Sequence, residues 1–292
     1  MGHDLEAREY KILLNPEKCS QLVKLYKVNE FWESDIRSVI VNTLGLPEDG
    51  LEDFKSRLDR GVAFYDAGSC ILTRHNFSLR DRQGPDPKTG EHERKISIKL
   101  RSPDLFVVAS TPLVGKKGKK PSFEEDIAPL EATDPDGRVT LESPPSMRSR
   151  FSLVAEEKVK AAAKLDTWAD AVRLFPSLPS LLPAAQLPAA NDPLQRGQAI
   201  RELAFKGAEC KLGDDVEAEF TLTLWFFASA PETVRIAEIS YKCEFKNGFM
   251  PREAALRAFR LFVGLQTRLS DRIDLREASK TKLALPTACA KP

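Results

Sequence analysis

Two neighbouring segments, residues 77–82 and 96–101, carry charged or hydroxyl side chains at every second position. Because the side chains of a β-strand alternate between two faces, each pattern predicts a strand with one polar and one apolar face. Asp81 interrupts the apolar face of the first segment, so the alternation there is imperfect. The polar positions are Ser78, Arg80 and Arg82 in the first segment and Ser97, Lys99 and Arg101 in the second.

The rest of the chain divides into further segments of strand or helix character. Asn15 followed by Pro16 is typical of a helix start. The pattern predicts strands near residues 8–14, 62–67, 146–154, 200–212, 216–227 and 234–245. It predicts helices near residues 15–26, within 28–61, at 155–175 and at 251–269, the last of which should pack on the outside of the sheet.

Two stretches lack any regular pattern. Residues 112–146 contain "GKKGKKP" and "ATDPDG" and predict a long surface loop. The lysines of residues 115–120 are interpreted as a solvated loop, with a lid that grips phosphate as the alternative. Residues 176–193 are rich in proline, which interrupts both helices and strands.

Composition excludes several classes of protein. Among the 292 residues, 30% are charged and 42% hydrophobic, which is ordinary for a globular protein and predicts no membrane span. The net charge is +1, so the molecule as a whole is not expected to bind nucleic acid. Five widely spaced cysteines without a CxxC motif favour reduced thiols and a cytoplasmic location. "MGHDLEAREYK" is too charged for a signal peptide.

The alternating charges allow two interpretations. The simpler one is a half-solvated antiparallel sheet whose polar face meets water. If the strands instead close into a barrel, one face becomes an interior. A barrel lined by lysine and arginine with some carboxylates suits a polyanion, because the cations bind phosphate oxygens and the carboxylates can hold Mg²⁺ or Mn²⁺.

Several motifs, in one order along the chain, resemble the CYTH domain, or triphosphate tunnel family. "FYD" at residues 64–66, "LRDR" at 79–82 and "ISIK" at 96–99 resemble three consecutive strands of that family. "AREYK" at residues 7–11 resembles its opening ExExK strand, and "AEISYKCEF" at 237–245 lies where the family carries alternating glutamates. "MRSRFSL" at 147–153 lies where the family has an Arg-x-Glu strand.

The resemblance implies a fold, a ligand and a set of site residues. It implies an α+β protein in which an eight-stranded antiparallel tunnel-like β-barrel has helices packed outside. It implies Glu9 and Glu238 as catalytic and metal-binding residues with Mg²⁺ or Mn²⁺ as cofactor. The residues expected to bind the substrate phosphates are Lys11, Arg80, Arg82, Lys99, Arg101 and Arg150.

The departures from the family pattern all weaken metal binding. The positions at which this chain lacks an expected carboxylate are Ala7, Ser152, Trp225, Ser240 and Lys242. The basic positions survive, so we expect polyanion binding to be kept and the metal site to be weak. Lys242 is expected to face the tunnel beside the metal position, where it could supply a counter-charge; a β-bulge that turns it outward is the alternative.

The predicted protein is thus a single CYTH-like domain over residues 1–292. It has inserted segments near 28–61 and 112–146 and a Pro-rich connection near 176–193. Its predicted ligand is a small molecule bearing a triphosphate or polyphosphate, which a metal-dependent triphosphatase would hydrolyse. The alternatives are a non-catalytic phosphate-binding module and a class IV adenylate cyclase-like activity. His75 and His92 have no partner at a recognisable spacing, Trp168 is expected in the core, and no serine hydrolase motif is present.

Overall fold

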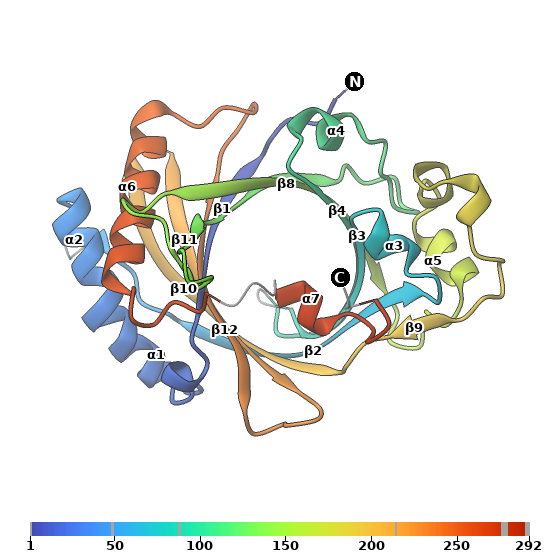
Figure 1. The fold of residues 1–292 in the computed structure, drawn as a ribbon, viewed down its shortest axis with the longest axis horizontal. Coiled ribbons are helices and arrows are strands. Elements are labelled where there is room, and N and C mark those ends of the chain that lie inside the picture. Colours follow the sequence, from blue (N-terminus) through green and yellow to red (C-terminus); the bar gives the residue numbers. More distant parts are fainter. Residues whose placement is uncertain (1, 48–49, 87–88, 214, 276–279, 290–292) are drawn as a thin grey trace.

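Nine strands close into a barrel around a central tunnel in the computed structural model, which describes residues 2–47, 50–86, 89–213, 215–275 and 280–289 (Figure 1). Around the barrel the order is β10-β11-β12-β1-β5-β8-β4-β3-β2, and β2 pairs with β10 to complete the ring. The barrel strands are β1 (Ala7–Leu14), β2 (Ser56–Ala67), β3 (Phe77–Pro85), β4 (His92–Ser102), β5 (Ser122–Pro129), β8 (Met147–Val159), β10 (Ile200–Gly213), β11 (Val216–Phe227) and β12 (Val234–Glu244).

The predicted tunnel-like barrel of an α+β protein is confirmed, but its strand count and orientation were wrong. The prediction had eight antiparallel strands, whereas nine strands form the ring and β1 runs parallel to β5. The difference arises in residues 112–146, which were predicted to be a surface loop. Residues 122–129 of that segment are β5, which lies between β1 and β8.

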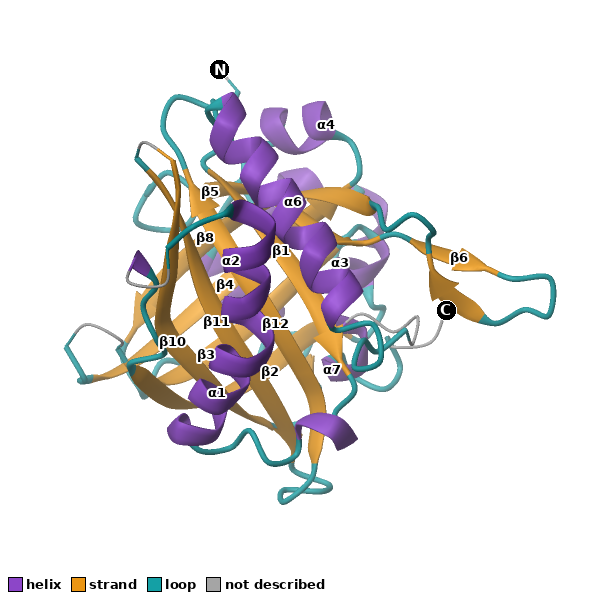
Figure 2. Ribbon diagram, turned by 90° about the vertical axis from the view of Figure 1, so that its left-hand side faces the viewer, coloured by secondary structure: helices purple, strands orange, loops and turns teal. Residues whose placement is uncertain are grey.

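The remaining strands are short and lie outside the ring. β9 (Leu194–Arg196) extends the sheet beside β2. β6 (Glu131–Thr133) and β7 (Val139–Leu141) form a separate hairpin that projects from the barrel (Figure 2). This hairpin is the part of residues 112–146 that does lie at the surface.

Helices cover the outside of the barrel, as predicted (Figures 1 and 2). On one side lie α1 (Leu25–Phe31), a π-helical turn (Trp32–Arg37), α2 (Ser38–Leu44) and α6 (Arg252–Arg268). The others outside the ring are α3 (Ile71–Arg74), α4 (Leu105–Ser110) and α5 (Trp168–Leu174), whereas α7 (Lys280–Ala284) borders the tunnel cavity. Short 3₁₀ turns occupy Glu17–Cys19, Leu178–Leu181 and Ala184–Gln186.

Two predicted helices are shorter than expected. The helix predicted at residues 155–175 begins only at Trp168, because β8 continues to Val159 in its pairing with β4. Thr167 and Asp170 form a capping box at its start. The helix predicted at residues 15–26 is only a 3₁₀ turn, although Asn15 Oδ1 does accept the Glu17 amide at 2.9 Å.

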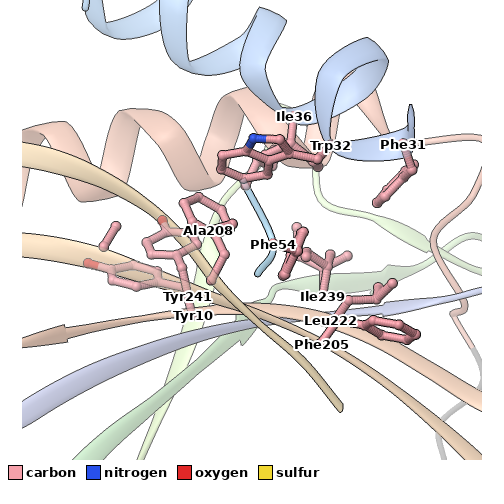
Figure 3. Packing of buried hydrophobic residues seen from close by; sticks show 14 of the residues in the cluster. Tyr10, Phe31, Trp32, Ile36, Phe54, Phe205, Ala208, Leu222, Ile239 and Tyr241 are labelled. Carbon is pink, nitrogen blue, oxygen red and sulfur yellow. The ribbon is translucent and has the colours of Figure 1, made fainter. Parts of the chain in front are cut away.

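The largest hydrophobic core lies between the barrel and the α1, α2 and α6 side (Figure 3). Tyr10 of β1 stacks on Tyr241 of β12 with ring centroids 4.7 Å apart. The Tyr241 hydroxyl donates to the Ala258 carbonyl of α6 at 2.6 Å, and Trp32 packs edge-on against Phe220 of β11. The outward faces of these strands are thus buried under helices, which leaves the polar faces pointing into the barrel.

The interrupted apolar face of β3 has a local explanation. Asp81 points outward and forms an ion pair with Arg94 of β4, with Nη2 to Oδ2 at 2.8 Å. Arg94 also donates to the carbonyls of Ala161 and Ala163, so the pair lies beneath the connection between β8 and α5. This charged pair on the outer face does not disturb the inward alternation of β3 and β4.

The predicted core position of Trp168 is confirmed, since it is 4% exposed.

The cysteines differ from the prediction of five reduced thiols. Cys70 and Cys289 form a disulfide, and Cys19, Cys210 and Cys243 are free and buried. The sequence spacing could not reveal this bond, which joins residues 219 positions apart. The cytoplasmic location, which rested on reduced thiols, stays a prediction. None of the described helices has the length and apolar character needed to cross a membrane.

Candidate functional site

The barrel encloses a charged cavity of about 650 Å³. Inward side chains from all nine barrel strands line it, together with residues of the C-terminal segment. Among the residues that the structure describes, twelve basic ones line it: Lys11, Arg60, Arg80, Arg82, Lys95, Lys99, Arg101, Arg148, Arg150, Lys206, Lys242 and Lys280. Nine described acidic residues also line it: Glu9, Glu93, Glu124, Asp126, Glu131, Glu156, Glu202, Glu238 and Asp274. The lining is therefore cationic overall, although the whole chain is nearly neutral.

All eight site residues predicted from the sequence line this cavity. They are Glu9, Lys11, Arg80, Arg82, Lys99, Arg101, Arg150 and Glu238. The simpler interpretation, a half-solvated sheet, is wrong for these strands because their polar faces form an interior. Their roles in binding or catalysis stay predictions.

Asp126 of β5 is the centre of one cluster of charges. Its carboxylate accepts from Lys11 Nζ at 2.6 Å. The other oxygen lies 2.9 Å from both Lys99 Nζ and Arg101 Nη2. Burial favours the neutral acid, but the three cations hold the pKa of Asp126 well below its usual range. Three of the predicted phosphate-binding cations therefore share one internal counter-ion.

A three-carboxylate group lies in the same cluster. One oxygen each from Glu9, Glu124 and Asp126 lies within 4.8 Å of the others. Carboxylate oxygens are the ligands that Mg²⁺ and Mn²⁺ prefer, so the donor set fits a divalent cation. Each carboxylate also has a lysine beside it: Lys11 Nζ is 2.7 Å from Glu9, and Lys242 Nζ is 2.9 Å from Glu124. A metal would have to compete with these two ammonium groups.

The structure separates Glu9 from Glu238 along the strands, and a metal shared by the two stays a prediction. Glu9 lies opposite Lys242 in the β1–β12 ladder, whereas Glu238 lies opposite Leu13. Glu9 and Leu13 are four residues apart along β1, which corresponds to roughly 13 Å between their Cα atoms. Glu238 instead pairs with Lys280 at 3.1 Å.

The sequence analysis missed Glu124 and Asp126 because both lie in the segment predicted to be a loop. A signal was present, since Ser122, Glu124 and Asp126 occupy alternate positions of a short strand. Glu125, on the opposite face, interrupts this alternation of polar and apolar positions. Its carboxylate faces outward and pairs with Arg8 at 2.6 Å.

Lys242 faces the tunnel, as predicted. The β1–β12 register runs without interruption from Glu244 to Ala237, so the alternative of a β-bulge at Lys242 is wrong. Its ammonium contacts Glu124 at 2.9 Å and Glu244 at 2.8 Å. Burial lowers its pKa, but these two carboxylates more than offset that effect and the pKa of Lys242 is raised.

A second cluster lies across β2, β3 and β10 and carries most of the unbalanced charge. Its members are Arg60, Arg80, Arg82, Lys206 and Glu202. Glu202 pairs with Arg60 at 2.7 Å and accepts from the Trp225 indole at 2.8 Å. Four cations thus lie around one carboxylate. We call these five residues the Arg80 cluster. Arg60, Glu202 and Lys206 were not singled out from the sequence.

Arg80 and Lys206 have no hydrogen bond or ion pair to any part of the chain that the structure describes. Burial, together with the neighbouring Arg82, lowers the pKa of Arg80 to about 10. Burial and the nearby Arg60 likewise lower the pKa of Lys206. Burial and the neighbouring cations both disfavour the charged forms of these side chains, so an anion bound here would stabilise them.

The other candidates from the sequence lie away from these clusters. His75 is half-buried, with its ring nitrogen 3.4 Å from Gln186, and His92 is exposed at the start of β4. Neither histidine is among the residues that line the cavity. The lysines of residues 115–120 are exposed and also absent from the lining, which favours the solvated loop over the lid.

Comparison with solved structures finds matches over nearly the whole chain. One is a candidate adenylyl cyclase from Hippeastrum, described as having a dominant triphosphatase activity, with 12% identity, 95% of this chain and 93% of that chain covered, and a TM-score of 0.46. Another is a candidate adenylate cyclase from Bacillus halodurans, with 11% identity, coverage of 97% and 98%, and a TM-score of 0.37. A third is the PH1819 protein from Pyrococcus horikoshii, with 11% identity, coverage of 93% and 94%, and a TM-score of 0.38.

The architecture is that of a charged tunnel barrel, as the resemblance to the triphosphate tunnel family predicted. No family profile matches the sequence, and no curated protein is significantly similar to it. At the TM-scores above, the structural matches add nothing to a choice of function. The function is therefore inferred from the tunnel itself.

Proposed function

We propose that the protein binds a triphosphate-bearing or polyphosphate ligand in the tunnel, with phosphates against the Arg80 cluster. The observation that carries this proposal is Arg80, a half-buried guanidinium that forms no ion pair with the described residues and lies near Arg82 and Arg60. A guanidinium presents several donors that match phosphate oxygens, and its charge persists at neutral pH. A linear polyanion meets several such cations at once, whereas orthophosphate meets fewer.

The Asp126 cluster supplies the second part of the proposed site. Lys99 and Arg101 face the same cavity as Arg80 and already share the Asp126 carboxylate. Because Lys99 and Arg101 share one carboxylate oxygen and carry several N–H donors each, they can also donate to a bound phosphate. A ligand of several phosphates could thereby span both clusters, which favours a chain of phosphates over a single one.

Hydrolysis with Mg²⁺ or Mn²⁺ is the second candidate function. It is favoured by the convergence of Glu9, Glu124 and Asp126, which could hold the metal. When bound, such a metal polarises a phosphoryl group toward attack by water. The chain's own residues would orient the phosphates, and Lys11 would have to leave Glu9 or Asp126 to make room. This competition favours slow turnover or binding alone.

Calorimetry with tripolyphosphate and orthophosphate, with chelator present, tests the binding proposal. We expect tripolyphosphate to bind more tightly, and Arg80→Gln to weaken it. Arg138→Gln, at an exposed position near the projecting hairpin, is the matched control. Equal or absent binding of the two anions would refute the proposal.

Phosphate release from a panel of triphosphates, with Mg²⁺, with Mn²⁺ and with chelator, separates the two functions. We expect turnover below the ordinary enzyme range of roughly 1 to 1,000 per second. Metal-dependent turnover within that range would establish the hydrolase instead.

A further inference from the structure

The C-terminal segment lies across one mouth of the tunnel. In Figure 1, α7 (Lys280–Ala284) is seen within the outline of the barrel ring. Lys280 and Thr281 belong to the cavity lining, so this helix borders the tunnel itself. Residues 280–289, which we call the C-terminal plug, therefore limit the space open to a ligand at this end.

A small apolar contact seats the plug on the barrel. Ala284 and Leu285 are buried with Phe64, Trp225 and other residues of one hydrophobic cluster. The approach is close at Gly197, where an added Cβ would clash with the Ala284 carbonyl oxygen. Any larger residue at position 197 would push the plug away.

Lys280 carries the polar contact between the plug and the tunnel. Its ammonium lies 3.1 Å from Glu238 and 4.5 Å from the centroid of the Trp225 ring. Glu238 therefore forms its ion pair with a residue of the plug, and Lys11 of β1 also attracts it. Removal of the plug would leave this carboxylate and the Trp225 face open to the cavity.

A covalent bond secures the same segment. Cys289 forms a disulfide with Cys70, which directly precedes α3, and the two Cα atoms are 5.3 Å apart. The noncovalent contacts described for the plug include the burial of Ala284, Leu285 and Pro286 and the Lys280–Glu238 ion pair. The disulfide keeps the plug near its seat even when those contacts open.

We propose that the C-terminal plug gates one mouth of the tunnel, that the Cys70–Cys289 disulfide latches it, and that reduction of this bond speeds the exchange of a tunnel-bound polyphosphate. This gating rests on the proposed function, whereas the latch itself does not. The reductant is a dithiol: it gives two electrons and two protons, the S–S bond breaks, Cys70 and Cys289 become thiols, and the dithiol becomes a disulfide.

Hydrogen exchange of the peptide covering residues 280–289 tests the latch without any ligand. We expect reduced wild-type protein and oxidised Cys289→Ser to exchange at least about fivefold faster than oxidised wild type, because the plug then opens more often. Thr287→Ser is the matched control: it changes an exposed residue of the same segment, keeps the disulfide and should respond to dithiol as wild type does. Equal exchange in the oxidised and reduced forms would overturn the latch.

Stopped-flow binding of tripolyphosphate tests the gate. We expect association and dissociation rates to rise together by about three- to tenfold on reduction, with Cys289→Ser showing the higher rates and no response to dithiol. Faster hydrogen exchange with unchanged binding rates would refute the gate. Absence of binding in every form would refute the proposed function, and the hydrogen exchange result would still decide the latch.

Discussion

The ammonium of Lys11 lies 2.6 Å from the Asp126 carboxylate, at the place where the tunnel's carboxylates converge. The two residues come from parallel neighbouring strands, 115 positions apart in the sequence. Because a lysine already balances the carboxylate that a metal would need, the tunnel can hold its charges together without one.

Asp126→Asn should destabilise the fold. The substitution leaves Lys11, Lys99 and Arg101 without their shared counter-ion, and breaking a buried ion pair costs about 3 to 5 kcal/mol. Urea unfolding without ligand would measure the lost free energy of unfolding. Glu30→Gln, which removes only an exposed pair with Lys27, is the control and should change it little. An Asp126→Asn protein as stable as wild type would contradict the role of this carboxylate.

Arg80→Gln should weaken tripolyphosphate binding about ten- to hundredfold. Arg80 has no internal counter-ion to lose, so the folded protein should tolerate the change, and a charge-assisted hydrogen bond contributes about 1.5 to 3 kcal/mol. Calorimetry with chelator measures the effect, with Arg138→Gln as control. If both variants bind as wild type does, the phosphates do not lie at the Arg80 cluster.

The affinity for tripolyphosphate should depend on the protonation of Lys99. Burial, together with the nearby Arg101 and Lys11, lowers the pKa of Lys99 to about 8 in the ligand-free protein. An anion favours the ammonium form, so this contribution is present below pH 8 and is lost as the pH rises through 8.

Lys99→Arg isolates this contribution, because arginine stays charged over the whole range. Titration of the ligand itself cancels in the ratio of the wild-type and variant dissociation constants. We expect that ratio to rise between about pH 7 and pH 9. A ratio that does not change with pH would show that Lys99 does not meet the ligand as a cation.

Lys242→Glu should weaken the binding of tripolyphosphate and strengthen the binding of Mn²⁺. It removes a cation from the tunnel and adds a carboxylate beside Glu124, with which Lys242 now pairs at 2.9 Å. We expect weaker metal-free binding of tripolyphosphate, by about 1 to 3 kcal/mol, and tighter binding of Mn²⁺. Lys242→Gln is the matched control, since it removes the cation without adding a ligand.

Calorimetry with tripolyphosphate and with Mn²⁺ alone measures both effects of Lys242→Glu. In Lys242→Gln the loss of tripolyphosphate affinity should remain, and the gain in Mn²⁺ affinity should be smaller. Unchanged affinities in a folded Lys242→Glu protein would mean that this lysine acts on neither the anion nor the metal.

The sequence alone determined which side chains face inward on several strands. Alternation with a period of two places Arg80 and Arg82 on one face of β3 and Lys99 and Arg101 on one face of β4, and the cavity lining includes all four. This prediction works because the pleat of a strand is a local property. It also predicted Lys242 on the tunnel side, but only the regular β1–β12 ladder of the structure excluded the alternative of an outward bulge.

Only the tertiary structure decided which of these faces meet. Glu9 gained Asp126 as its neighbour through the parallel pairing of β1 with β5, and a local pattern contains no information about such a long-range partner. Glu238 kept its inward face but lies in another layer of the barrel, where Lys280 of the plug holds it. The Cys70–Cys289 bond likewise depends on two distant segments ending side by side. Strand periodicity is set by the backbone of each segment, whereas the composition of the site is set by closure of the ring.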